Sequence, residues 1–182
     1  MSTTPFGINA DTLSLRPLRK VVFALGSNLG DRLDQLDQAV AQLRATPDLR
    51  IVAVSPVYET AAVGGPADSP AFLNAVVVTE TTQSAEAMLA RIGAIEEAAG
   101  RTREVHWGPR TLDVDIIVYG DRIIDEPELT VPHPRAHQRA FVLAPWADVE
   151  PDAVIPGHGP IAELLAGLET GGIRRLEECI AA

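Results

Sequence analysis

Residues 20–43 read KVVFALGSNLGDRLDQLDQAVAQL, which combines the pattern of a buried strand with that of a helix. The run from Val21 to Leu25 is apolar and partly β-branched, and the turn-forming letters GSN end it. Asp31 stands where a helix N-cap belongs, and apolar residues follow it at helical spacing as far as Pro47. This stretch therefore predicts a strand, a turn and a helix.

The same two patterns recur along the chain in a definite order. They predict strands over 51–58, 72–81 and 110–119, a loop over 59–70, and a helix from Ser84 to Gly100. With the first strand and helix, the order is βαββαβ. That order is typical of an α+β fold with a ferredoxin-like core, in which helices pack on a mainly antiparallel sheet.

A C-terminal extension follows the predicted core. We expect a short strand near Ile123, a proline-rich segment over 127–134, and two short helices near His137 and Ile161. A ferredoxin-like fold hosts many unrelated functions, so the activity must be inferred from individual residues.

Length and composition suit one globular domain. The chain has 182 residues, 46% of them hydrophobic, so we expect a flexible tail over 1–19 and a single domain over 20–182. Its apolar runs are far shorter than the ~20 residues that span a bilayer, and no signal segment opens the chain, so we expect a cytoplasmic protein without membrane association. The single cysteine, Cys179, cannot form an internal disulfide, and we interpret it as a small packed hydrophobe.

The charge distribution restricts the possible ligands. A net charge of −10 opposes binding to nucleic acid, so an anionic ligand must be held locally. All but one of the basic residues are arginine, and Arg101, Arg103 and Arg110 fall close together. Such a group beside acidic residues is a candidate phosphate clamp.

The acidic residues in question stand in WGPRTLDVDII, residues 107–117. In a strand, Asp113 and Asp115 point to one face, while Leu112, Val114 and Ile116 point to the other. Three outcomes would relieve the repulsion between the two carboxylates: one protonates, both pair with arginine, or a divalent cation binds between them.

Two solvated acids on an exposed face remain the simplest alternative for a D-x-D motif. The rigid Gly-Pro turn that delivers Arg110 to the same place favours a phosphate–magnesium complex. The chain has no G-x-x-x-x-G-K-[ST] loop and its only lysine is Lys20, which excludes a P-loop kinase.

Several motifs occur together in an order that identifies a family. These are GSNL at 26–29, FLN at 72–74, R-x-R at 101–103, WGPRTLDVDII at 107–117 and LTVPH at 129–133. From about residue 20 to about residue 165, the chain resembles 6-hydroxymethyl-7,8-dihydropterin pyrophosphokinase, a family of the folate pathway. The resemblance implies transfer of pyrophosphate from the co-substrate ATP to the hydroxymethyl group of the pterin, release of AMP, and two Mg²⁺ ions.

The resemblance also implies roles for residues. The metal ligands would be Asp113 and Asp115. The catalytic set would be Arg101, Arg103, Trp107, Arg110 and Asp115, with Arg103 and Trp107 on a loop that closes over the reactants. ATP would be bound by Glu96, Arg101, Arg110, Ile116, Thr130, His133 and Arg139, and the pterin by Phe72, Asn74, Asp113 and Phe141. The substrates are small molecules, and we expect a monomer.

The chain departs from the family pattern at three of these motifs. His106 stands where the family usually has an arginine, Pro134 where some relatives have a tyrosine, and Phe72 lacks a tyrosine hydroxyl. A catalytically inactive relative is one alternative, and only the His106 departure points to it. The others are a two-metal nucleotidyltransferase, which would release pyrophosphate, and a non-catalytic module that binds a small ligand. Two routes for the proton of the attacking hydroxyl stay open. Asp115 accepts it, or metal coordination lowers the pKa of the hydroxyl so far that no protein base is needed.

Overall fold

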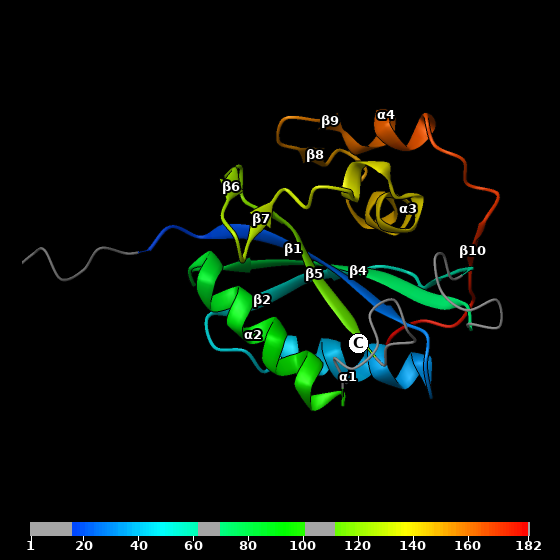
Figure 1. The fold of residues 1–182 in the computed structure, drawn as a ribbon, viewed down its shortest axis with the longest axis horizontal. Coiled ribbons are helices and arrows are strands. Elements are labelled where there is room, and N and C mark those ends of the chain that lie inside the picture. Colours follow the sequence, from blue (N-terminus) through cyan, green and yellow to red (C-terminus); the bar gives the residue numbers. More distant parts are fainter. Residues whose placement is uncertain (1–15, 62–69, 101–111, 182) are drawn as a thin grey trace, which may run out of the picture.

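The computed structural model of the chain describes residues 16–61, 70–100 and 112–181. These form a mixed α/β fold in which helices cover both faces of a central antiparallel sheet (Figure 1). The strands of this sheet are β1 (Arg19–Ser27), β2 (Leu49–Val54), β3 (Tyr58–Thr60), β4 (Phe72–Thr81), β5 (Asp113–Tyr119) and β10 (Ile173–Arg175).

The order of the strands places β1 and β4 at the centre. The sheet runs β10-β3-β4-β1-β5, and β2 also pairs with β4. β4 is long enough for both neighbours, since β3 pairs with its first three residues and β2 with its second half. Every pairing is antiparallel, as the sequence predicted.

Helices α1 (Arg32–Arg44) and α2 (Ala85–Ala98) begin where the sequence predicted. The Asp31 carboxylate accepts a hydrogen bond from the Asp34 N–H, and the Ser84 hydroxyl accepts one from the Ala87 N–H, so each cap satisfies a donor of the first turn. After α2 the chain turns through Gly100 at φ +74°, a conformation that favours glycine.

A strand predicted over 51–58 is two separate strands. β2 ends at Val54, and β3 begins at Tyr58 and continues to Thr60, inside the predicted loop. Pro56 has no N–H to offer a ladder, and the Ser55 hydroxyl accepts the Val76 N–H at 2.8 Å where the strand breaks.

The C-terminal extension contains a helix that the sequence did not predict. Helix α3 (Ala140–Val149) is apolar on most of its surface, so its sequence lacks the alternation of apolar and polar residues that marks a helix with one buried face. It also contains Pro145, which is usually a sign that a helix ends. The predicted helices near His137 and Ile161 are the 3₁₀ turn η2 (Ala136–Gln138) and α4 (Ile161–Ala166). The His137 and His158 rings stack at a centroid distance of 3.9 Å.

Short hairpins complete the extension. β6 (Ile124–Asp125) pairs with β7 (Thr130–Val131), and β8 (Val154–Ile155) pairs with β9 (Gly159–Pro160). Cys179 is exposed, so the interpretation as a packed hydrophobe was wrong. Among the described residues, no helix has both the length and the apolar character needed to span a bilayer.

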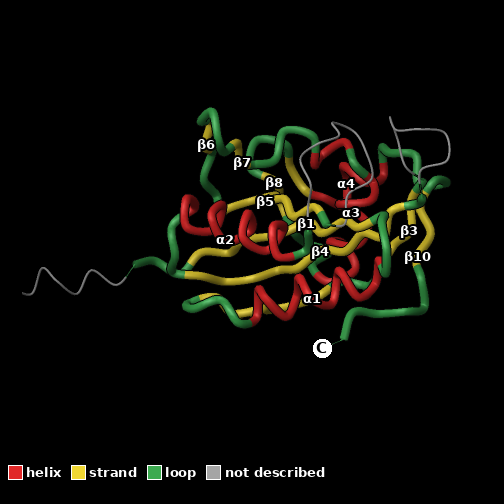
Figure 2. Tube along the Cα trace, turned by 60° about the horizontal axis from the view of Figure 1, so that its bottom comes forward, coloured by secondary structure: helices red, strands yellow, loops and turns green. Residues whose placement is uncertain are grey.

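Two hydrophobic clusters lie on opposite faces of the sheet. One joins the sheet to α1 and α2 and includes Leu36 and Met88. The other joins it to α3 and α4 and includes Leu143 and Trp146. Figure 1 shows α1 and α2 on one side of the strands and α3 and α4 on the other, and in the turned view of Figure 2 α1 and α2 come forward. The end of β5 is therefore buried on both faces.

Candidate active site

One row of residues crosses three strands at the end of β1. Gly26 pairs with Asn74 of β4 on one side and with Asp113 of β5 on the other. Paired residues in a sheet project to the same face, so Asn74 and Asp113 flank a position without a side chain. A Cβ at Gly26 would lie 3.3 Å from Asn74 Oδ1 and 3.7 Å from Phe72 Cδ1, which shows that these side chains lean over the glycine.

The two aspartates share the face that the sequence predicted. Asp113 and Asp115 are half-buried, whereas the neighbours Leu112, Val114 and Ile116 are buried in the α2 side of the sheet. On β1, Asp115 pairs with Ala24 and Asp113 pairs with Gly26. The β1 neighbours of both carboxylates are therefore small residues.

This face is the one that α3 covers. The alternation along β1 and β4 places Phe72, Asn74, Ala24 and Gly26 on the same side as Val76, which packs in the cluster beneath α3. Phe141, near the start of α3, packs against that cluster, and the Arg139 guanidinium lies 5.5 Å from the centre of its ring. The predicted pterin residues of β4, β5 and α3 therefore occupy one face of the sheet.

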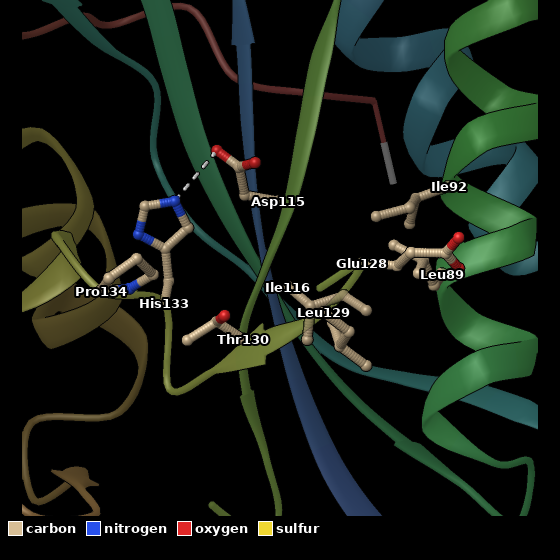
Figure 3. A pocket seen from close by; sticks show the side chains of 9 residues that line it. All are labelled: Leu89, Ile92, Asp115, Ile116, Glu128, Leu129, Thr130, His133 and Pro134. Atoms are coloured by element: carbon tan, nitrogen blue, oxygen red, sulfur yellow. Dashed lines mark ion pairs between the residues drawn. The ribbon is translucent and has the colours of Figure 1, made fainter. Parts of the chain in front are cut away.

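A pocket of about 210 Å³ opens beside β5, around the edge of the sheet (Figure 3). It is lined by Leu89, Ile92, Asp115, Ile116, Glu128, Leu129, Thr130, His133 and Pro134. The apolar walls come mainly from α2 and β5, and Thr130 and His133 lie across the pocket from α2 (Figure 3). The pocket unites four residues that the sequence assigned to ATP or metal: Asp115, Ile116, Thr130 and His133.

The backbone of β5 faces this pocket. The Val114 N–H donates to Glu96 Oε1 at 2.9 Å, so the main chain at that position points away from β1 and toward α2. The alternation of a strand points the N–H and C=O of Ile116 in the same direction. Ile116 can therefore offer both a donor and an acceptor to a ligand, while its side chain stays buried.

His133 holds a defined tautomer. Its Nδ1 accepts the Arg135 N–H at 3.1 Å, so the neutral ring carries its proton on Nε2. Burial, followed by the positive charges of Arg139 and Arg135, lowers the pKa of His133 to about 4. The Nε2 atom lies 3.9 Å from Asp115 Oδ2 (Figure 3), too far for a hydrogen bond, so the neutral ring presents an N–H donor beside the carboxylate.

The carboxylate pair is chemically suited to a hard cation. Asp113 and Asp115 present carboxylate oxygens on one face, and the Asp115 side chain is 47% exposed, so an ion and its water can reach it. Among the described residues, no cluster of three or more histidine, cysteine or acidic side chains could hold a metal. Mg²⁺ is commonly held by one or two carboxylates together with substrate phosphates, and this donor set fits that pattern.

Four predicted catalytic residues, Arg101, Arg103, Trp107 and Arg110, lie outside the described residues, as does His106. The sequence analysis missed Thr60, which binds Asn74, because Thr60 fell in the predicted loop. It also missed Leu89, Ile92 and Glu128 of the pocket. The apolar pair is part of the predicted core face of α2, and no local pattern distinguishes a core position from one that also lines a pocket.

Comparison with known proteins identifies relatives that cover most of the chain. The model of the family "7,8-dihydro-6-hydroxymethylpterin-pyrophosphokinase (HPPK)" matches residues 22–151. A protein of Pseudomonas aeruginosa named 2-amino-4-hydroxy-6-hydroxymethyldihydropteridine pyrophosphokinase is 43% identical over 159 residues, which cover 87% of this chain and 98% of the relative. A protein of Methylorubrum extorquens with the same name is 41% identical over 160 residues, covering 88% of this chain and 100% of the relative.

Solved structures share the fold at lower sequence identity. The wild-type HPPK-DHPS of Plasmodium falciparum with pterin and p-hydroxybenzoate aligns with a TM-score of 0.66 at 17% identity. The alignment covers 85% of this chain but only 44% of the Plasmodium chain, so this chain spans less than half of that protein. At this level of identity the likeness concerns the fold alone.

Proposed function

The chain belongs to the 7,8-dihydro-6-hydroxymethylpterin-pyrophosphokinase family, and from this premise we propose how its residues carry out the reaction. It is a pyrophosphokinase of folate biosynthesis that transfers pyrophosphate to the hydroxymethyl group of 6-hydroxymethyl-7,8-dihydropterin, with ATP as co-substrate. The match over residues 22–151, which contains most of β1, all of β2 to β5 and both aspartates, is the observation that carries this assignment.

We propose a single in-line displacement. The hydroxymethyl oxygen of the pterin attacks the β-phosphorus of ATP, and the bond from that phosphorus to the oxygen bridging to the α-phosphorus breaks. AMP leaves with the bridging oxygen, and the hydroxyl proton is released. Phosphoryl transfer of this kind depends mainly on positioning and on neutralising phosphate charge.

The nucleotide would occupy the pocket beside β5. Leu89 and Ile92 offer an apolar wall for the base, and the main chain of Ile116 offers a donor and an acceptor for its edge. Thr130 would lie near the adenosine. The neutral His133 would donate a hydrogen bond on the phosphate side, and Arg139 adds a positive charge near His133. Glu96, which holds the Val114 N–H, is at the end of α2 where we propose the ribose.

The pterin would lie on the sheet face above Gly26. Phe72 and Phe141 are proposed to stack on its ring faces, and Asn74 and Asp113 to bind its polar edge. The support for this proposal is the register, which brings Asn74 and Asp113 to either side of Gly26.

Magnesium dependence is part of the proposal. Asp113 and Asp115 would hold two Mg²⁺ ions together with phosphate oxygens. When bound, the ions neutralise phosphate charge and lower the pKa of the attacking hydroxyl. Arg101 and Arg110 would bind the phosphates, and Arg103 and Trp107 would close over the reactants and exclude water; these roles come from the family motif alone.

We further propose that residues 20–182 act as one ferredoxin-like domain and as a monomer. The order β3-β4-β1-β5, with α1 and α2 on one face, supports a βαββαβ core to which β2 and β10 would be additions. The net charge of −10 supports small-molecule substrates over nucleic acid.

Product analysis tests the reaction. The chain is mixed with ATP, Mg²⁺ and 6-hydroxymethyl-7,8-dihydropterin, and the nucleotides are separated by ion-exchange chromatography. We expect AMP that forms only when the pterin and Mg²⁺ are present. ADP would indicate transfer of one phosphoryl group, released pyrophosphate would indicate a nucleotidyltransferase, and no turnover would indicate a binding protein; each result would overturn the proposal.

A further inference from the structure

The C-terminal strand β10 lies beyond residues 22–151, which match the family, yet it contacts the element next to the proposed pterin site. Its three residues pair with β3, so that Ile173 stands opposite Thr60 and Arg175 opposite Tyr58. The pairing extends one step further, because the Leu176 N–H donates to the Val57 carbonyl at 2.8 Å. β3 is thus enclosed between β4 and β10.

Side chains hold β3 from both faces of the sheet. Glu59 accepts hydrogen bonds from Arg174 of β10 and from Arg32 of α1, each at 3.1 Å. On the other face, the Tyr58 hydroxyl donates to Asp148 of α3 at 2.6 Å, and Arg175 lies 3.7 Å from the same carboxylate. A strand of three residues with one neighbour would be only marginally ordered, so β10 and these ties determine where β3 lies.

β3 in turn orients Asn74. The Thr60 hydroxyl oxygen accepts a hydrogen bond from Asn74 Nδ2 at 3.0 Å, and the bond is buried, since Asn74 is 5% exposed and Thr60 8%. The other end of the carboxamide, Oδ1, lies over Gly26. A buried amide held at one end has few rotamers left, so its free end is prepared for a ligand.

We propose that β10 is a positioning element for pterin recognition: by holding β3 it keeps Thr60 in place to orient the Asn74 carboxamide. The inference rests on the proposed function, which assigns the polar edge of the pterin to Asn74. Thr60 and Arg174 are positioning residues in this scheme, since they act through Asn74.

A purely structural strand would behave differently. If β10 only covered the edge of the sheet, its loss would lower stability and the amount of active enzyme, and the apparent affinities for ATP and pterin would change together or not at all. A positioning role instead predicts a selective rise in the KM for the pterin. This difference separates the two roles even when stability also falls.

Variants at Thr60 test whether its hydroxyl orients the Asn74 carboxamide. Thr60→Val keeps the shape and removes the hydroxyl, and Thr60→Ser retains the hydroxyl. We expect Thr60→Val to raise the KM for 6-hydroxymethyl-7,8-dihydropterin about fivefold to tenfold, the loss of about one hydrogen bond, with the KM for ATP unchanged. Thr60→Ser should restore the pterin KM to within about twofold of the wild-type value.

Variants of β10 test whether this strand keeps β3 and Thr60 in place, and Arg50 provides a matched control. Arg174 and Arg50 are 72% and 74% exposed, and each pairs with a glutamate on a neighbouring strand, but Arg50 joins β2 to β4, away from Thr60. We expect Arg174→Gln to raise the pterin KM and Arg50→Gln to leave both KM values unchanged. A chain that ends at Gly172, without β10, should show the larger rise.

Combining the β10 and Thr60 variants tests whether both act on the pterin through Asn74. In a truncated Thr60→Val chain, the pterin KM should be no higher than that of the more affected single variant. If the truncated chain does not fold, Arg174→Gln combined with Thr60→Val serves for the same comparison. Additive increases, equal changes in both KM values, or an unchanged pterin KM in Thr60→Val would overturn the inference, while a wild-type chain that yields no AMP would overturn the proposed function itself.

Discussion

At the level of single residues, the carboxylate pair of β5 depends on its neighbours on β1. Asp113 stands beside Gly26 and Asp115 beside Ala24, so the β1 neighbours of both acids are small residues. An isolated buried carboxylate would be costly, whereas these two are half-buried and accessible to a cation. Their alternation was predictable from the sequence, but the small residues beside them depend on the register of two strands that lie far apart in the chain.

The pair gives a direct prediction. We expect Asp113→Asn and Asp115→Asn each to lower kcat about a hundredfold or more, because each removes a metal-binding charge while leaving the fold intact. Turnover at saturating Mg²⁺ and thermal unfolding by circular dichroism measure the two effects. Asp121→Asn is the control, because the Asp121 side chain is 96% exposed and should leave activity unchanged. Normal turnover in either Asp113→Asn or Asp115→Asn would contradict the metal-ligand assignment.

Gly26 provides a second prediction at this scale. A Cβ at Gly26 would stand 3.3 Å from Asn74 Oδ1, so Gly26→Ala should displace the carboxamide and raise the KM for the pterin about tenfold. Gly93 of α2 is a matched control, since a Cβ there meets nothing within 4 Å and Gly93→Ala should raise stability by about 1 kcal/mol without changing either KM. Steady-state kinetics and urea unfolding test both; an unchanged pterin KM in Gly26→Ala would show that the site is not above the glycine.

At the level of elements, the predictable parts are those with local signals. Asp31 and Ser84 cap α1 and α2 as their positions indicated, because a cap depends on residues within one turn. α3 was missed because Pro145 interrupts it and its surface is mostly apolar. β3 was missed because three residues carry no periodicity, and their strand conformation depends on β4 and β10, which lie elsewhere in the chain.

The ties of β3 predict a pH dependence of stability. The hydrogen bond from Arg174, and after it Arg32, holds the pKa of Glu59 below its ordinary value of 4.5, although burial opposes the shift. Because the folded pKa is lowered, the stabilisation is present above the pKa of the unfolded chain and is lost as the pH falls through the folded pKa. We expect Glu59→Gln to cost about 1 kcal/mol at pH 7.

Urea unfolding of the wild-type chain and Glu59→Gln between pH 7 and pH 3 measures this effect. The difference in unfolding free energy should be constant near neutral pH and should shrink below the ordinary carboxylate range, as Glu59 becomes protonated in both states. A difference that persists undiminished at the acidic end would show that the variant acts through packing rather than charge.

At the level of the whole molecule, one sheet separates two hydrophobic clusters. Leu36 belongs to the cluster on the α1 side and Leu143 to the cluster under α3, and both are fully buried. The strands supply side chains to both clusters, so disrupting the packing of either cluster should unfold the sheet. The same arrangement places the site on the α3 face and the pocket around the edge of β5, next to α2.

Cooperative unfolding follows from the shared sheet. We expect Leu36→Ala and Leu143→Ala each to cost about 2–5 kcal/mol and to leave a single transition. In a Trp107→Phe background, tryptophan fluorescence reports only Trp146, which lies in the second cluster. In Leu36→Ala and in Leu143→Ala, the urea midpoint of the Trp146 fluorescence transition should coincide with the midpoint of the circular dichroism transition. A fluorescence transition that stays in place in Leu36→Ala while the circular dichroism transition shifts would show two independent units.

The sequence by itself determined the main strands and helices, the common face of Asp113 and Asp115, and the family to which the chain belongs. These follow from spacing and motif letters among neighbours in the chain. Only the tertiary structure decided that Gly26 stands between Asn74 and Asp113, that α2 forms a wall of the pocket, and that β10 holds β3. Each of these depends on register and packing between distant segments, which no local pattern encodes.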